Sequence, residues 1–272
     1  MCLLMAWTLP GCAGLFFYPE RDHYLDPADH DIAYEDVEFQ ASDGVRLHGW
    51  WLPASGEPRG TVLFLHGNAQ NISTHIAAVY WLPDQDFNVF MPDYRGFGKS
   101  EGRPDFAGVH RDAEAALAIA RDRADSDGTA LAVFGQSLGG AIAITLVAEA
   151  GERYDVDALV ADSPFSSYRG IAREKFAEVW LTWPLQYPLS WAISDRFAPI
   201  DFIADVSPIP VLLMAGDQDV IVPPHHAEAL YQAARPPKEI RRASSAGHTQ
   251  SLTVRGEREY LVDWLKTWLP TP

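Results

Sequence analysis

The sequence predicts an α/β fold in which a mostly parallel central sheet carries helices on both of its faces. Continuous apolar runs at residues 61–65, 131–134 and 158–161 are typical of strands that are buried on both faces of a parallel sheet. Residues 108–124 lie between two of these runs and carry apolar side chains at helical spacing with charges between them, which predicts an amphipathic helix. Because buried strands alternate with helices, we expect right-handed crossovers that make neighbouring strands parallel.

Composition and charge exclude several classes of partner. The chain has 272 residues, of which 47 % are hydrophobic and 21 % are charged, and this length is sufficient to bury a core. Its formal net charge of −16 argues against nucleic acids and anionic membrane surfaces as partners. The two cysteines are Cys2 and Cys12, and no Cys/His spacing resembles a zinc site. We therefore expect no metal and no cofactor. We also expect the protein to be a monomer or a weak oligomer.

The first 14 residues predict an export segment. Their sequence, MCLLMAWTLPGCAG, is a short apolar run followed by small residues, and it is too short to span a bilayer. The stretch LPGC at residues 9–12 resembles the bacterial lipobox, which implies cleavage and attachment of lipid to Cys12. On this interpretation the protein is exported to the bacterial cell envelope, where it is periplasmic or held at a membrane through its lipid alone. The alternative is an apolar arm that packs on the domain of a cytoplasmic protein.

The chain then reaches its folded domain. Residues 15–33, rich in Pro, Asp and His, predict a tether that leads into a domain at residues 34–272. Alternating residues at 34–40 and 45–52 predict a hairpin around the turn ASDG. The next predicted elements are strand 61–65, helix 75–81, strand 88–91, helix 108–124, strand 131–134, a helix to residue 150 and strand 158–161.

The alternation breaks after residue 162, where residues 163–208 predict a small helical cap inserted after the sixth strand. A helical piece at 170–180 is followed by a proline-interrupted aromatic stretch that fits neither a strand nor a regular helix. The alternative is a helix pair that packs against the side of the domain. The sheet then resumes with strand 211–215, helix 225–233, strand 239–243 and helix 255–269.

Ser137 lies in a sharp turn between a predicted strand and a predicted helix, in the sequence GQSLG. The turn is so tight that side chains at Gly135 and Gly139 would collide with neighbouring backbone. This is the G-x-S-x-G nucleophile elbow in its required context, and it predicts that Ser137 is a nucleophile. The alternative is an incidental serine in a turn bracketed by glycines.

A nucleophilic serine needs a base and an orienting acid, because its hydroxyl is nearly inert at neutral pH. We expect the acid and then the histidine on loops after later strands. His248, after the last predicted strand, is the predicted base. The loop GDQD offers two acids, of which we prefer Asp219 over Asp217 because an apolar VIVP anchor follows it, and Asp162 is a third candidate. A loop aspartate that merely caps a turn is the alternative.

Two backbone N–H groups are expected to stabilise the oxyanion. One belongs to Leu138, directly after the nucleophile, and the other to Asn68 in the HGNA loop after strand 61–65. His66 is expected to brace this loop. His225 and His226 are predicted to be a solvated helix start rather than a metal pair, since adjacent residues do not share a helix face.

Four motifs resemble the α/β-hydrolase superfamily over the chain from about residue 34. They look like a branch that includes serine-aminopeptidase-like and acyl-thioesterase-like hydrolases. The motifs are HGNAQN at 66–71, DYRGFGKSEG at 93–102, GQSLGG at 135–140 and GDQDVIVPP at 216–224. The resemblance implies the α/β-hydrolase fold and a serine hydrolase with a triad of Ser137, His248 and Asp219.

The aromatic residues of the predicted cap, rather than the resemblance, indicate the substrate, which we expect to be a small-molecule ester with a small to medium acyl group, cleaved through an acyl-enzyme intermediate. Aromatic side chains of the cap are expected to line an acyl pocket, and they are Trp180, Trp183, Tyr187 and Trp191. Hydrolysis of an acyl thioester, or of an amide as by an aminopeptidase, is compatible with the same triad. A non-catalytic binding protein of the envelope is a further alternative.

Overall fold

The computed structural model describes residues 16–269 of the chain. The predicted export segment and Cys12 lie outside these residues. Within them, the structure contains no helix that is both long enough and apolar enough to cross a membrane.

An eight-stranded sheet forms the centre of the molecule, in the order β10-β9-β8-β7-β4-β6-β3-β2. Strand β3 pairs antiparallel with β2 and with β6, whereas all the other neighbours are parallel. The strands are β2 (Glu35–Gln40), β3 (Arg46–Leu52), β4 (Gly60–Leu65), β6 (Phe87–Asp93), β7 (Ala130–Gln136), β8 (Val156–Asp162), β9 (Val211–Gly216) and β10 (Lys238–Ala243). The predicted mostly parallel sheet and its N-terminal hairpin are confirmed.

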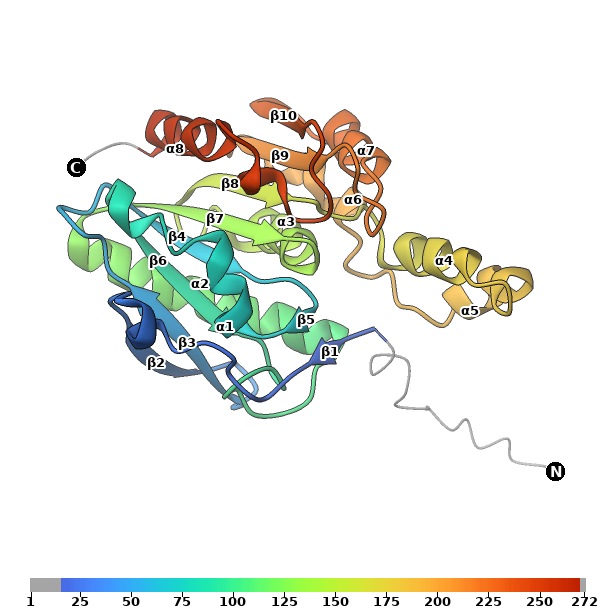
Figure 1. Cartoon of the computed structure of the whole chain (residues 1–272), viewed down its shortest axis with the longest axis horizontal. Coiled ribbons are helices and arrows are strands. Elements are labelled where there is room, and N and C mark those ends of the chain that lie inside the picture. Colours follow the sequence, from blue (N-terminus) through green and yellow to red (C-terminus); the bar gives the residue numbers. More distant parts are fainter. Residues whose placement is uncertain (1–15, 270–272) are drawn as a thin grey trace.

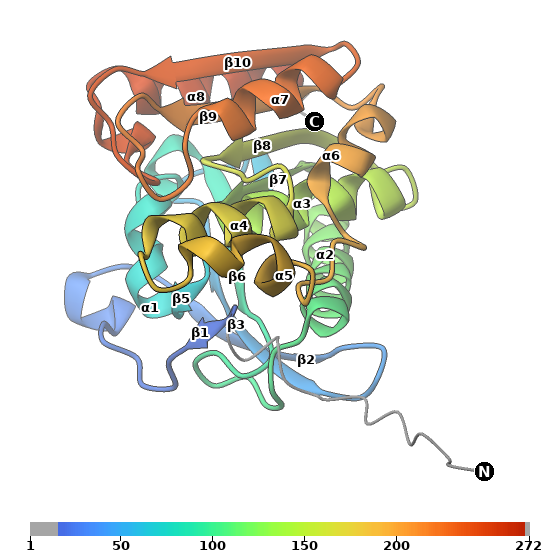
Figure 2. The ribbon, with the colours of Figure 1, turned by 90° about the vertical axis from the view of Figure 1, so that its right-hand side faces the viewer.

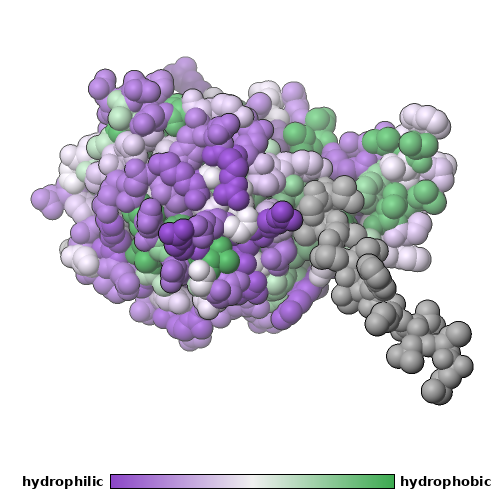
Figure 3. Space-filling view, turned by 90° about the horizontal axis from the view of Figure 1, so that it is seen from below, coloured by the Kyte–Doolittle hydropathy of each residue, from purple (hydrophilic) through white to green (hydrophobic). Residues whose placement is uncertain are grey.

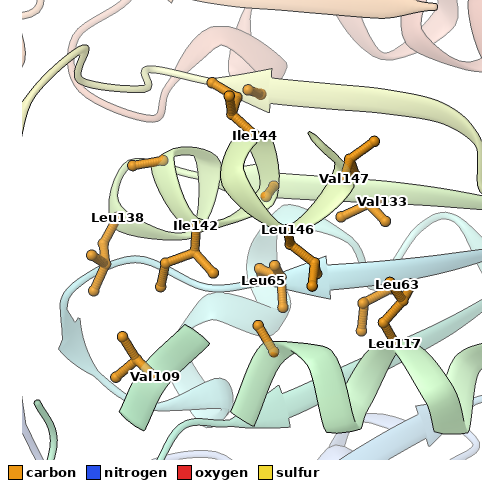
Figure 4. Packing of buried hydrophobic residues seen from close by; sticks show 14 of the residues in the cluster. Leu63, Leu65, Val109, Leu117, Val133, Leu138, Ile142, Ile144, Leu146 and Val147 are labelled. Carbon is orange, nitrogen blue, oxygen red and sulfur yellow. The ribbon is translucent and has the colours of Figure 1, made fainter. Parts of the chain in front are cut away.

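Both faces of the sheet are buried, because successive side chains of a strand point to opposite faces. On β4, Leu63 and Leu65 belong to one hydrophobic cluster, whereas Val62 and Phe64 belong to the other. The first cluster packs against α2 (Phe106–Asp127), α3 (Leu138–Ala150) and α7 (His225–Ala233), and part of it is shown in Figure 4. The second packs against α1 (Ile72–His75) and α8 (Glu257–Trp268). Helices therefore cover both faces, as predicted (Figure 1).

The helix predicted at residues 75–81 is wrong. The chain forms the single turn α1, and the 3₁₀ helices η3 (Ile76–Ala78) and η4 (Pro83–Gln85) follow it. Ile76, Val79 and Leu82 are all buried, so the apolar positions recur every three residues. That spacing suits the three-residue turn of a 3₁₀ helix rather than the wider turn of an α-helix.

A projection follows β8, the sixth strand of the large sheet. Figure 1 shows α4 (Tyr168–Glu178) and α5 (Gln186–Ser190) standing out from the body of the molecule, and Figure 2 looks onto these two helices from that side. The 3₁₀ helix η5 (Trp183–Leu185) lies between them in the chain. We call residues 168–191 the cap. The rest of the predicted insertion returns to the core, where α6 (Pro199–Phe202) and η6 (Ile203–Val206) pack against α3.

The N-terminal segment crosses the end of the sheet where the parallel strands finish. Its strand β1 (Tyr18–Pro19) pairs with β5 (Ala69–Gln70) in the loop after β4, and the 3₁₀ helix η2 (Pro27–His30) follows. Phe16 contacts the rings of Phe106 and Tyr168, so this segment also touches the base of the cap. A last 3₁₀ helix, η7 (Ser251–Thr253), precedes α8.

His110 on α2 gives the fold a dependence on pH. Its ring stacks on Phe197 with centroids 4.1 Å apart, and burial lowers the pKa of His110 to about 3. An unfolded histidine titrates near pH 6.5, so below that pH unfolding takes up a proton and the folded state loses stability. We expect the free energy of unfolding to fall by about 1.4 kcal/mol for each pH unit below about 6.5 on account of this residue. Urea unfolding of wild type and His110→Gln across this range should show a flatter dependence for the variant, and equal slopes would contradict this assignment.

Candidate active site

Ser137 lies between β7 and α3 in a backbone conformation that is rare for a residue with a side chain. Its φ is 53° and its ψ is −114°. A Cβ placed on Gly135 would lie 2.2 Å from the carbonyl oxygen of Gly139, and one on Gly139 would lie 1.9 Å from that of Leu65. Both glycines are therefore required by close approach of backbone, which is the physical reason for the sequence pattern around Ser137.

Ser137, His248 and Asp219 form a continuous hydrogen-bonded chain. Nε2 of His248 lies 2.9 Å from Oγ of Ser137, and its Nδ1 lies 2.8 Å from Oδ2 of Asp219. Ser137 follows β7, Asp219 follows β9 and His248 follows β10. Because these strands are parallel, their carboxyl ends lie at the same edge of the sheet. The side chain of His248 is 16 % exposed and that of Asp219 is 1 % exposed, so solvent reaches the histidine but scarcely reaches the acid.

The Asp219 carboxylate is held in one orientation. Its Oδ1 accepts hydrogen bonds from the backbone N–H groups of Ile221 and Val222, at 2.9 and 2.8 Å, which leaves Oδ2 for His248. Burial raises the pKa of Asp219, but the hydrogen bonds and the charge of His248 outweigh burial and leave the pKa below its ordinary value. The carboxylate is therefore ionised at neutral pH.

The other two candidate acids lie elsewhere. Asp217 is 38 % exposed and accepts a hydrogen bond from Nε of Arg242 at 2.6 Å, on the surface. Asp162 is fully buried at the end of β8, where it accepts hydrogen bonds from Gln136 and Ser251. The structure thus brings Asp219 to His248. Within residues 16–269, neither Asp217 nor Asp162 is hydrogen-bonded to that histidine.

The loop that follows β4 packs directly against the elbow. The Cβ that Gly139 lacks would also lie 2.6 Å from the carbonyl oxygen of His66, so the two backbones are in contact. Leu138 is the first residue of α3, where backbone N–H groups have no partner within the helix. The side chain of Asn68 donates a hydrogen bond to the carbonyl oxygen of Phe16 at 2.5 Å, so the N-terminal segment holds Asn68. The oxyanion role of Leu138 and Asn68 stays a prediction.

His66 lies beneath this loop. Its Nδ1 is 2.7 Å from the carbonyl oxygen of Gly67, and Tyr94 donates a hydrogen bond to the carbonyl oxygen of His66. Burial, together with the neighbouring His75, lowers the pKa of His66 to about 4, so the ring is neutral at physiological pH. These contacts agree with a bracing role.

Comparison with known proteins identifies the family. The sequence profile described as "Serine aminopeptidase, S33" matches residues 56–196, just over half of the chain. The chain belongs to the serine aminopeptidase S33 family of α/β hydrolases.

Two relatives extend this likeness over most of the chain. It is 37 % identical over 266 residues to the Escherichia coli K12 protein YfhR, covering 95 % of this chain and 89 % of that protein. It is also 37 % identical over 229 residues to the Arabidopsis thaliana α/β hydrolase domain-containing protein WAV2, covering 80 % of this chain and 73 % of that protein. The segments that carry Asp219 and His248 lie beyond the S33 match but within the described fold.

A solved structure shows the same fold. The Pyrococcus furiosus esterase Pf2001 superimposes with a TM-score of 0.74 at 24 % identity, over 93 % of this chain and 98 % of that one. Membership of the S33 family together with this fold supports hydrolase activity.

The cap of this S33 member presents its aromatic side chains to solvent. The four residues expected to line an acyl pocket are between 56 % and 83 % exposed, namely Trp180, Trp183, Tyr187 and Trp191. Tyr187 and Trp191 line a cleft of about 410 Å³ between the cap and the start of α7. Figure 3 shows apolar side chains gathered at the end of the molecule that the cap forms. A pocket role for the four stays a prediction, and their exposure suits an outer surface as well.

His226 corrects one sequence-based prediction. His225 is solvated as expected, but the side chain of His226 is only 2 % exposed, because the start of α7 lies against the cap. The Nε2 atoms of both rings approach Glu174 on α4, at 3.2 and 3.3 Å. Nδ1 of His226 accepts a hydrogen bond from the backbone N–H of Ser166, so the proton of a neutral ring lies on Nε2 and points to Glu174. The two histidines thus link the cap to α7 by hydrogen bonds.

Proposed function

We propose that this chain is a serine hydrolase that cleaves carboxylic ester bonds of small to medium acyl substrates. The observation that carries the proposal is the unbroken hydrogen-bonded chain from Asp219 through His248 to Ser137. A hydroxyl of this kind becomes a nucleophile when a neighbouring base removes its proton and an acid fixes the tautomer of the base.

The reaction follows from the positions of these groups. Nε2 of His248 takes the proton of Ser137 as Oγ attacks the ester carbonyl, and the backbone N–H groups of Leu138 and Asn68 stabilise the resulting oxyanion. His248 then gives its proton to the leaving alkoxide, and an acyl-enzyme forms. Water attacks the acyl-enzyme while His248 accepts its proton, and return of that proton to Oγ releases the acid and restores Ser137. Asp219 stabilises the imidazolium in both halves of the reaction.

A substrate series tests the bond type. We expect purified protein to hydrolyse p-nitrophenyl esters of short to medium chains faster than an aminoacyl amide or an acyl thioester. The exposed aromatic side chains of the cap suit an apolar acyl group, and the cap carboxylates that could hold a charged amine are already bonded, Glu174 to His225 and His226 and Glu178 to Lys175. A faster rate with the thioester or with the amide would replace the ester proposal by one of those activities. Lack of labelling by a fluorophosphonate probe, which reacts with activated serines, would instead support a non-catalytic binding protein.

We also propose that the protein is exported and lipid-modified at Cys12, which would place the cap at a membrane. The support is the lipobox-like LPGC together with the position of Phe16, four residues after Cys12, against Phe165 and Tyr168 at the base of the cap. The exposed aromatic side chains of the cap form an apolar patch, and such a patch on a soluble domain marks an interaction surface. Mass spectrometry of the mature protein should find an acylated N-terminal cysteine at position 12, and an intact Met1 would contradict export.

A further inference from the structure

Three side chains from distant parts of the sequence, two of them buried and one partly buried, converge beneath the N-terminal segment. They are His23, between β1 and η2, His48 on β3, and Asp93 at the end of β6. One ligand atom from each lies within 4.8 Å of those of the other two, and Nε2 of His23 is 3.5 Å from Oδ2 of Asp93. Their side chains are 15 %, 5 % and 0 % exposed, respectively.

Each of these side chains carries a buried polar atom with no hydrogen-bond partner among residues 16–269. The atoms are Nε2 of His23, Nδ1 of His48 and Oδ2 of Asp93. A buried polar atom without a hydrogen bond is unfavourable because it has lost its hydrogen bonds to water without replacement, and the cost is larger for a carboxylate oxygen. Three such atoms on three side chains that meet in one place indicate a ligand that satisfies them together.

The hydrogen bonds around the cluster prepare two of these atoms to bind a cation. Nε2 of His48 lies 2.5 Å from Oδ1 of Asp36, which can only accept, so Nε2 carries the proton and Nδ1 keeps its lone pair. The two ring nitrogens point in widely different directions, so Nδ1 faces away from Asp36. Oδ1 of Asp93 accepts from the backbone N–H of Ile72 at 3.0 Å, which leaves Oδ2 for the cluster. A carboxylate on the far nitrogen of a histidine is the usual partner of a metal-ligating histidine.

Gly98 keeps the space beside the cluster free of a side chain. Its φ is +45°, and a Cβ there would lie 2.0 Å from Oδ2 of Asp93 and 2.8 Å from Nε2 of His23. Its backbone N–H donates to the carbonyl oxygen of Glu20 at 2.8 Å, which closes the N-terminal segment over the cluster. Any other residue at this position would block both atoms.

We propose that His23, His48 and Asp93 bind one divalent transition-metal ion of the Zn²⁺ class, which fastens the N-terminal segment to the end of the sheet. Two imidazole nitrogens and one carboxylate oxygen suit such an ion, whereas Mg²⁺ and Ca²⁺ prefer sites made of oxygen alone. A second cluster among residues 16–269 consists of Glu174, His225 and His226. It is less suited to a metal, because Nε2 of His226 carries a proton toward Glu174 and has no free lone pair. No metal was expected from the sequence, because no closely spaced Cys/His pattern is present and these three residues lie on separate elements.

The experiment uses the full chain after treatment with EDTA and dialysis, titrated with Zn²⁺ and with Co²⁺. We expect one bound ion per chain by elemental analysis, a raised unfolding temperature, and a Co²⁺ absorption spectrum typical of mixed nitrogen and oxygen ligands. His23→Ala should lose the stoichiometric ion, and Asp36→Asn should weaken binding about 10–100-fold, since Asp36 only positions His48. Glu174→Gln is the matched control and should bind as wild type does.

A readout on the wild-type protein keeps the test independent of variant folding. Arg21 is exposed in the N-terminal segment, two residues before His23. Zn²⁺ should slow tryptic cleavage after Arg21 while leaving cleavage at distant sites unchanged. Absence of a stoichiometric ion in the wild-type protein would overturn the proposal and leave ordered water as the partner of these atoms. Binding that survives His23→Ala but is lost in Glu174→Gln would overturn it as well.

Discussion

Ser137→Ala should lower kcat for a p-nitrophenyl ester by about 10⁶-fold, to a residual rate that comes from binding and the oxyanion donors alone. The expected loss is this large because Oγ of Ser137 is the atom that forms the acyl-enzyme, and no other hydroxyl shares a described hydrogen bond with Nε2 of His248. The measurement compares kcat of the variant and the wild type, with labelling by a fluorophosphonate as a second readout that does not depend on the choice of ester.

Two controls separate chemistry from folding. Ser126→Ala changes an exposed serine on α2 and should leave kcat unchanged. The Ser137→Ala protein should unfold at the temperature of wild type or close to it, since its Cβ and backbone are unaltered. Ester hydrolysis at the wild-type rate in Ser137→Ala would show that Ser137 is not the nucleophile.

The core of the site could be predicted from sequence because its signals are local. Gly135 and Gly139 are required by contacts of their own backbone with the next turn and the neighbouring strand, so the pattern is visible in five residues. The order of the loops follows from the alternation of strands and helices, which placed Asp219 and His248 at the same edge of the sheet as Ser137.

The parts that the sequence did not predict depend on contacts between distant segments. Burial of His226 results from the cap lying over the start of α7, which no local pattern indicates. The hydrogen bond from Asn68 to the carbonyl oxygen of Phe16 joins residues 52 positions apart. The Asp/His/Pro-rich composition of residues 15–33 predicts only a tether. The predicted helix at 75–81 was wrong because apolar side chains at every third position are easily taken for one face of an α-helix.

A matched pair of substitutions tests the acid. Asp219→Asn should lower kcat by about 10⁴-fold, because an amide donates a hydrogen bond to Nδ1 of His248 and so favours the tautomer whose proton faces Ser137. That tautomer cannot accept the proton of the hydroxyl. The backbone N–H groups of Ile221 and Val222 can still bond to the amide oxygen, so the fold should be retained.

Asp217→Asn is the control in the same loop, two residues away. It removes the surface ion pair with Arg242, which is expected to contribute about 0–1 kcal/mol to stability and nothing to the chemistry. Its kcat should therefore equal that of wild type within about twofold, since a stability change of this size leaves the folded population intact. If Asp217→Asn loses activity while Asp219→Asn keeps it, the acid is Asp217, and the hydrogen bond of Asp219 to His248 would then be structural. Wild-type kcat in both variants would mean that His248 needs no carboxylate. This is the least expected result, because the Asp219 side chain is buried against the ionisable ring of His248.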